Sequence, residues 1–184
     1  MQNLSHTSYI NRLKVINIKS ETLFREAEDD FYYFNNVNSA LKKLKEALKL
    51  TPYHKKSLIL AGDIYFIKGQ LKKALKLYIN AYKINSDETK IQASICNCYY
   101  ALKDYNNALK YCNKALKGSE YENTLLYSQL TEIKINILIE LKQYNSAYKI
   151  FTSWQTAEKN TNFEFIKEKI ELQNKLKHSR LKIV

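Results

Sequence analysis

An internal repeat of 34 residues is the feature of this sequence that most constrains its fold. Ala-Leu pairs begin at Ala40, Ala74 and Ala108, and the steps are 74 − 40 = 34 and 108 − 74 = 34. Three further sets of positions keep the same step: Ala47, Ala81 and Ala115; Phe31, Tyr65 and Tyr99; and Val37, Leu71 and Tyr105. Four sets in one phase indicate a chain built from repeated structural units that stack on one another.

The spacing inside each unit is helical. In the second unit one apolar stripe falls at i, i+3, i+4 and i+7, on Leu58, Ala61, Gly62 and Tyr65. After Lys68-Gly69-Gln70 a second stripe begins, on Leu71, Ala74, Leu75, Tyr78 and Ala81. The small residues Gly62, Ala74 and Ala81 indicate where two helix backbones approach closely. One such helical hairpin cannot cover its own apolar face, so neighbouring hairpins must stack.

The sequence resembles the tetratricopeptide repeat (TPR) family. The second unit, residues 55–88, matches best, through Leu58, Ala61, Gly62, Tyr65, Gly69, Ala74, Tyr78 and Ala81. The first unit, residues 21–54, matches through Phe24, Ala27, Phe31, Ala40, Leu44, Ala47 and Pro52, with Glu28 at the usual small position. The third unit, residues 89–122, matches through Ile95, Cys96, Tyr99, Tyr105, Ala108, Cys112 and Ala115, with Gln92 in place of a large apolar residue.

A fourth unit, residues 123–161, is degenerate. Its second helix matches through Tyr144, Ala147 and Phe151, but the step from Ala108 to Ala147 is 39. Its first helix, at about residues 122–141, is predicted to be over-long, and Lys134 and Ile135 stand where the motif has apolar and small residues.

The resemblance implies an all-α fold, a right-handed α-solenoid of stacked helical hairpins. The run Thr161-Asn162-Phe163-Glu164 is a capping box, which predicts a C-terminal capping helix over residues 162–184. Residues 1–20 show no clear period and are predicted to be an N-terminal arm, either a short helix or a loosely attached segment.

The resemblance also predicts a binding groove, because in this family the first helix of each repeat lines a concave face that contacts an extended peptide or a partner's helix. Carried over residue by residue, the groove comprises Arg25, Asp29, Tyr32 and Tyr33, then Lys56, Ile59, Asp63, Phe66 and Ile67, then Lys90, Ala93, Asn97 and Tyr100, with Glu132 and Asn136 as its continuation. The expected apolar anchors are Tyr32, Tyr33, Phe66, Ile67 and Tyr100, and the expected polar contacts are Asp29, Asp63 and Asn97. Tyr32, Phe66 and Tyr100 lie 34 residues apart and are predicted to face solvent. The competing interpretation is compositional, since the chain has 15 Tyr and 7 Phe.

Some TPR proteins bind the C-terminal carboxylate of chaperones through a clamp of Lys, Asn and Arg, and this sequence lacks that clamp. Arg25 and Asp29 stand at its first Lys and Asn, Leu60 at its middle Asn, and Ser94 at its closing Arg; only Lys90 fits. An Asp beside a terminal carboxylate would repel it.

The net charge of +12 leaves a second function open. Only three of the 30 basic residues are Arg (Arg12, Arg25 and Arg180), whereas phosphate-binding sites favour the bidentate Arg fork. A solvated Lys surface is therefore the preferred interpretation, and nucleic acid is not expected as a partner. Residues 41–90 nevertheless hold 12 Lys against 4 acidic residues. The alternative is therefore an RNA- or membrane-surface-associated protein acting through its Lys-rich surface.

The sequence offers no basis for catalysis or for a cofactor. His6, His54 and His178 are scattered, and the three glycines cannot form a phosphate-binding loop. Cys96, Cys98 and Cys112 are expected to be small buried hydrophobes rather than metal ligands. The acidic residues Glu21, Glu26, Glu28, Asp29 and Asp30 are expected to favour a helix start and solubility.

Taken together, these patterns predict a non-catalytic protein-interaction module or adaptor without metal or cofactor. We expect it to be cytoplasmic, because the cysteines do not form a disulfide pattern and no apolar run is long enough for a signal peptide or a membrane span. The identity of the partner and the oligomeric state stay open.

Overall fold

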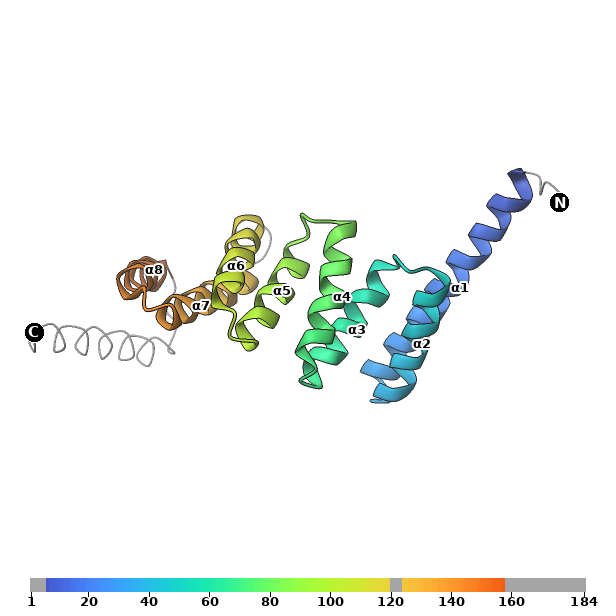
Figure 1. Ribbon diagram of the computed structural model, residues 1–184, viewed down its shortest axis with the longest axis horizontal. Coiled ribbons are helices and arrows are strands. Elements are labelled where there is room, and N and C mark those ends of the chain that lie inside the picture. The colour runs from blue at the N-terminus through green and yellow to red at the C-terminus, as the bar shows by residue number, and fades with distance from the viewer. Residues whose placement is uncertain (1–5, 120–123, 158–184) are drawn as a thin grey trace, which may run out of the picture. The chain divides into compact units, whose positions relative to one another are not determined.

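The computed structural model describes residues 6–119 and 124–157, and every regular element in these two ranges is an α-helix (Figure 1). None of the described helices is both long and apolar enough to cross a bilayer. The chain divides into two compact units, Met1–Asp87 and Glu88–Val184, called unit 1 and unit 2. The predicted capping helix at 162–184 lies outside the described residues.

Unit 1 consists of two antiparallel helical hairpins. The first pairs α1 (His6–Tyr32) with α2 (Val37–Leu50), and the second pairs α3 (Lys55–Ile67) with α4 (Leu71–Ile84). One apolar cluster joins both hairpins, because α2 also packs against α3. It contains Phe24, Ala27, Ala40, Leu44, Leu60, Ala61 and Ile64.

Unit 2 repeats this arrangement with α5 (Thr89–Ala101) against α6 (Tyr105–Ser119) and α7 (Thr124–Glu140) against α8 (Tyr144–Ala157). Helix α7 has 17 residues where α3 and α5 have 13 each. Ile135, which departs from the motif, is fully buried in a cluster with Phe151 and Trp154. A larger residue at this position is therefore accommodated in the core of the last hairpin.

Small residues set the distance between the two helices of a hairpin. Gly62 of α3 faces the ring of Tyr78 of α4, and a Cβ atom on Gly62 would lie 2.6 Å from Tyr78 Cε1. Ala74 and Ala81 on α4 have no exposed surface. The close approach predicted from these residues is thus confirmed, and it lets the Tyr78 ring fill the space that a larger neighbour would occupy.

The turn inside each hairpin uses one left-handed residue at a repeated position. These residues are Asn35, Gly69, Lys103 and Lys142, with φ of 50°, 70°, 61° and 59°. The first three lie 34 residues apart, and the fourth follows after 39, which matches the repeat steps in the sequence. Only the second unit places glycine there, so three of the four turns hold a side chain in a conformation that disfavours it.

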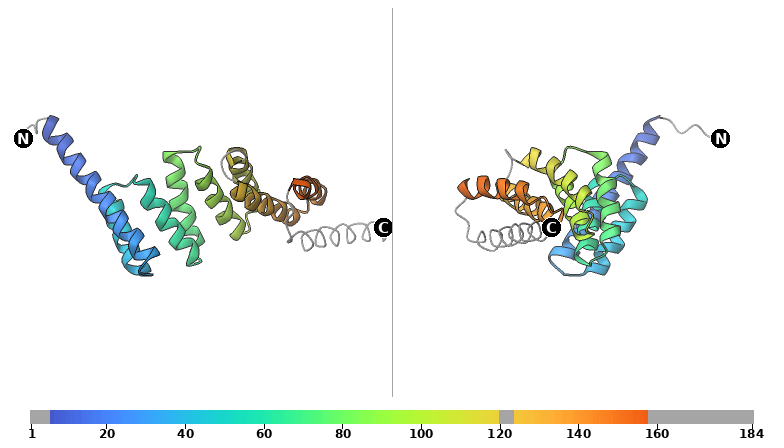
Figure 2. Two further views of the ribbon diagram at one scale, coloured as in Figure 1. Left: turned by 180° about the vertical axis from the view of Figure 1, so that it is seen from behind. Right: turned by 60° about the vertical axis from the view of Figure 1, so that its left-hand side comes forward.

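Helix α1 extends well beyond its partner α2 (Figure 2). It begins at His6, so the residues 6–20 that were assigned to an arm continue the first repeat helix without a break. Tyr9, Leu13 and Ile16 fall on the same helical stripe as the buried Phe24 and Ala27, because each step along that stripe is three or four residues. Tyr9 and Leu13 are exposed, since α2 does not reach them.

The left-handed turn gives a test of the fold. Replacing Lys103 with Gly relieves the side chain at φ 61°, and we expect the free energy of unfolding to rise by about 0.5–1 kcal/mol. The matched control is Lys68→Gly, one residue before the equivalent turn position, where φ is −74°. Glycine relieves nothing there and should lower stability by a similar amount. Urea unfolding followed by circular dichroism measures both, and equal losses in the two variants would contradict the proposed strain.

Candidate functional site

A buried polar cluster fixes the first helices of the two hairpins in unit 1 against each other. Lys56 donates from Nζ to Oε1 of Glu21 over 2.7 Å, and His54 Nε2 lies 3.0 Å from Glu21 Oε2. The other ring nitrogen of His54, Nδ1, lies 2.7 Å from Ser57 Oγ. Because His54 is the residue that precedes α3, this cluster sets the position at which α3 begins beside the middle of α1.

The expected helix-start role of the acidic residues is wrong. Glu21 lies in the interior of α1, and Glu28, Asp29 and Asp30 lie in its last turn, where negative charge is unfavourable. Their charges are balanced across the hairpin instead, since Lys43 Nζ of α2 lies 2.9 Å from Asp30 Oδ2 and 3.5 Å from Glu26 Oε2. The error arose because the stripe of α1 before Phe24 has no buried partner in the repeat pattern and so gave no helical signal.

The Glu21 cluster has a pH dependence of defined sign. The hydrogen bond from Lys56 lowers the pKa of Glu21, burial opposes this, and the hydrogen bond from His54 lowers it further. A carboxyl with a lower pKa in the folded chain stabilises the fold above its unfolded pKa, and this contribution is lost as the pH falls towards the folded pKa.

We therefore expect Glu21→Gln to lower the melting temperature at about pH 7, and the difference from the unsubstituted chain to shrink towards zero at about pH 3. The control is Glu46→Gln on α2, because Glu46 is exposed. Differential scanning fluorimetry across this pH range measures both. A difference for Glu21→Gln that is independent of pH would show that its role is packing alone.

The predicted groove residues of unit 1 form an exposed apolar surface at the ends of α1 and α3. Tyr32 and Tyr33 are 62% and 80% exposed, and Ile67 is 71% exposed. Burial raises the pKa of Tyr32, and Asp63 of α3 and Glu28 raise it further, so Tyr32 lies on the side of α1 that faces α3. Phe66 and Ile59 are half-buried. The sequence thus predicted a solvent-facing ring correctly at Tyr32 but not fully at Phe66.

The polar groove residues of unit 1 are partly engaged with the protein itself. Asp63 accepts a hydrogen bond of 2.6 Å from the Tyr78 hydroxyl of α4. Burial raises the pKa of Asp63, and the bond from Tyr78 opposes this. Lys56 is held by Glu21 and lies 5.6 Å from the centroid of the Phe24 ring. Arg25 Nε is 3.8 Å from Glu21 Oε1 with its side chain 74% exposed, and Asp29 is exposed, so these two remain accessible to a ligand.

In unit 2 the first helices enclose a cavity of about 310 Å³. Helix α5 contributes Lys90, Ala93, Ser94 and Asn97, and α7 contributes Leu125, Leu126 and Gln129. The structure therefore brings the predicted residues Lys90, Ala93 and Asn97 into one concavity. The α7 residues were missed because the motif of the fourth unit is degenerate, and its register could not be carried over residue by residue. The apolar pair at 125–126, at the start of the predicted first helix, was the available signal.

Tyr100 lies beside acidic residues in unit 2. It is half-buried, and its ring centroid is 6.0 Å from that of Tyr105. Burial raises the pKa of Tyr100, and Glu140, Tyr105 and Glu132 raise it further. The predicted continuation at Glu132 is thus close to Tyr100, and a cationic group on a ligand would be favoured there.

The cysteines form part of the core of unit 2. All three are buried as free thiols, and Cys112 donates from Sγ to the Leu130 carbonyl over 3.3 Å. The hydrogen bond with Cys112 and burial raise the pKa of Cys96, which keeps the thiol protonated and unreactive. No group of metal-binding side chains occurs in the part of the chain that the structure describes.

The comparisons with known proteins agree with this architecture. The family model described as INTS8, TPR repeats matches residues 15–125. A tetratricopeptide repeat protein from Parabacteroides merdae is 21% identical with a TM-score of 0.74, and the match covers 85% of this chain and 60% of that one. The first TPR of Spaghetti (RPAP3), solved bound to an HSP90 peptide, is 18% identical with a TM-score of 0.58, covering 64% and 91%.

The Sgt2 TPR domain from Aspergillus fumigatus is also similar, at 16% identity and a TM-score of 0.58, covering 69% of this chain and 82% of that one. Among curated protein sequences none matches. At these identities the similarity to solved structures concerns the fold, and it confirms the predicted all-α solenoid of helical hairpins.

Proposed function

The chain belongs to the tetratricopeptide-repeat family, and from this membership we propose that it is a non-catalytic protein-interaction module that binds a peptide or a helix of another protein. The proposed site is the face formed by the first helices, α1 and α3 in unit 1 and α5 and α7 in unit 2. The observation that carries the proposal is the cavity between α5 and α7, which contains Lys90 and Asn97 as the sequence predicts.

The chemistry of this cavity suits a peptide. Its volume of about 310 Å³ lies at the lower end of ligand pockets. Leu125 and Leu126 offer apolar surface, Asn97 can donate to and accept from a peptide backbone, and Lys90 can bind a carbonyl or carboxylate. Such a mixture of apolar contact and a few convergent polar groups is typical of a specific binding site.

The apolar surface of unit 1 supports the same role. Tyr32, Tyr33 and Ile67 are large, exposed and on first helices, where the fold does not need them for its core. Exposed apolar patches of this kind mark interaction sites, and aromatic residues dominate the energetics of protein interfaces.

The partner we propose differs in chemistry from the chaperone C-terminus. Spaghetti (RPAP3), one of the structural neighbours, was solved with an HSP90 peptide, but this chain lacks the carboxylate clamp of such TPR proteins. Leu60, at the position of the middle Asn, is buried in the core of unit 1, and Asp29 would repel a terminal carboxylate. The free buried cysteines support a reducing, cytoplasmic setting for the interaction.

The proposal is tested by removing side chains of the first helices that fold stability does not require. We expect the variant Tyr32→Ala/Asn97→Ala/Leu125→Ala to keep its melting temperature, because Tyr32 is 62% and Leu125 66% exposed. We expect it to lose its partner, since truncating an interface aromatic often costs about 2 kcal/mol. Quantitative mass spectrometry of pull-downs from the source cell measures the loss against the unsubstituted chain.

The matched control for this experiment lies on the second helices. Lys42, Lys76 and Lys110 are exposed on α2, α4 and α6, and their triple Ala variant should retain the partner. If the Lys variant loses the partner and the first-helix variant keeps it, binding uses the second helices and the proposed site is wrong.

The alternative function, binding of RNA or a membrane surface through the Lys-rich surface, makes a different prediction. Binding of polyuridylate through Lys would release counterions, so its affinity would fall steeply between about 50 and 200 mM salt. Under the proposed function we expect little binding of this RNA or of anionic vesicles at physiological salt. Tight binding at about 150 mM salt, measured by fluorescence anisotropy, would favour the alternative.

A further inference from the structure

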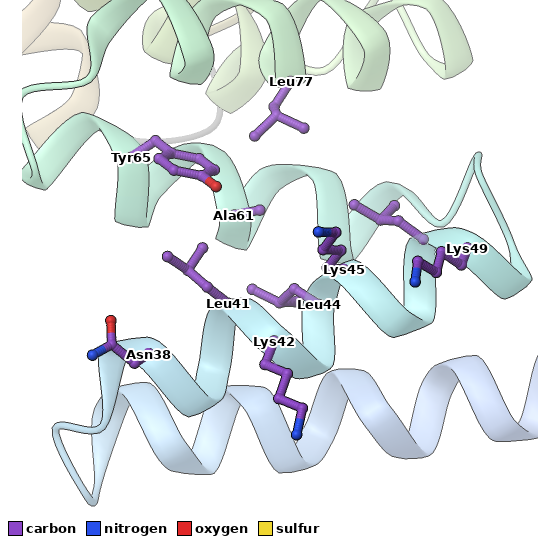
Figure 3. A pocket seen from close by; sticks show the side chains of 10 residues that line it. Asn38, Leu41, Lys42, Leu44, Lys45, Lys49, Ala61, Tyr65 and Leu77 are labelled. Carbon is purple, nitrogen blue, oxygen red and sulfur yellow. The ribbon is translucent and has the colours of Figure 1, made fainter.

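A second groove lies in unit 1 on the side of α3 away from Asp63 and Phe66. It is a cavity of about 700 Å³ between α2, α3 and α4 (Figure 3). Because it is lined chiefly by the second helices α2 and α4, it is separate from the face to which the proposed function is assigned. Its volume is within the range of sites that hold several side chains of a ligand.

The floor of this groove is apolar. Leu44 and Ala61 are buried beneath it, while Leu41, Leu48 and Leu77 are half-buried and line its walls. The intrahairpin packing that covers Leu44 and Ala61 leaves these three leucines partly open to solvent. An aliphatic or aromatic side chain inserted there would remove their remaining apolar surface from water.

The rim of the groove carries positive charge from one helix. Lys42, Lys45 and Lys49 of α2 line it, all three are exposed, and none makes an ion pair with an acidic side chain within the ranges 6–119 and 124–157. In Figure 3 the amino groups of Lys45 and Lys49 lie towards the space between α2 and α3, whereas Lys42 points away from it. The nearest acid on the same helix, Glu46, is outside the lining.

We propose that this groove binds an acidic protein segment that carries large apolar side chains. The apolar side chains would occupy the space bounded by Leu41, Leu48 and Leu77, and carboxylates beside them would pair with Lys45 and Lys49. These two lysines are one helical turn apart, about 6 Å along α2, which matches carboxylates at positions i and i+4 of a helical ligand. Unpaired cations at an apolar groove give both the affinity and the charge selectivity for such a segment.

The apolar floor favours a protein segment over a nucleic acid or a lipid headgroup. Phosphate groups would find Lys45 and Lys49 at the rim, but a phosphodiester backbone offers no aliphatic groups for the walls formed by Leu41, Leu48 and Leu77. A peptide provides both in alternation along one chain.

The test uses a fluorescein-labelled amphipathic peptide of about 18 residues, or five helical turns, with Leu along one stripe and Glu on its flanks. A second peptide has the same composition in scrambled order. At about 150 mM salt we expect Lys45→Glu/Lys49→Glu to weaken binding of the amphipathic peptide about ten-fold or more, and the scrambled peptide to bind poorly. Fluorescence anisotropy gives the dissociation constants.

The matched control is Lys42→Glu/Lys76→Glu, which makes the same change in net charge with side chains outside the groove or pointing away from it. Its dissociation constant should stay within about two-fold of the unsubstituted chain. Equal weakening by both pairs, equal binding of the scrambled peptide, or displacement of the peptide by polyuridylate or phosphatidylserine vesicles at equal charge would overturn the proposal in favour of a non-specific cationic surface.

A measurement on the unsubstituted chain keeps the test independent of variant stability. In amide NMR spectra, the amphipathic peptide should shift resonances of α2 and α4 around Leu48 and Leu77. Shifts confined to Tyr32, Ile67 or Asn97 would place the peptide on the first helices; they would overturn this proposal and leave the proposed function intact.

Discussion

The close approach of the two helices within a hairpin is the constraint on which the remaining structure depends. The alanines that open the second helices, Ala40, Ala74, Ala108 and Ala147, have no exposed surface, and Gly62 leaves room for the Tyr78 ring against its backbone. Because the helices lie so near each other, aromatic and branched side chains must project into the spaces between successive hairpins. Those side chains then provide the apolar surface that makes one hairpin stack on the next.

Most of the fold could be predicted because this constraint is written in small residues at a fixed step. The prediction was poorest at the ends of the repeat array. Helix α1 continues back to His6, yet residues before Glu21 carry no repeat period, since the stripe at Tyr9 and Leu13 is exposed and has no partner hairpin to impose a pattern. A repeat motif records packing between neighbours, and it is silent where a neighbour is missing.

The candidate site could be predicted in part. Register along α5 placed Lys90 and Asn97 on one wall of a cavity, but the opposite wall, Leu125 and Leu126 of α7, depends on how far a degenerate helix is shifted. Register also cannot reveal which polar side chains the protein occupies itself. Asp63 has the position of a ligand-binding residue, but its bond to Tyr78 and the bonds of Lys56 to Glu21 are tertiary interactions between helices, which no single-helix pattern encodes.

Helix α3 shows how one core can support two distinct surfaces. Ala61 and Tyr65 line the groove shared with α2 and α4, while Asp63 lies on the side of Tyr32 and contributes to its raised pKa. Tyr78 connects the two sides, since its ring packs on Gly62 and its hydroxyl bonds Asp63. A displacement of α4 that widened the groove would therefore strain the Asp63 bond, so the packing that builds unit 1 also couples the positions of its two candidate binding surfaces.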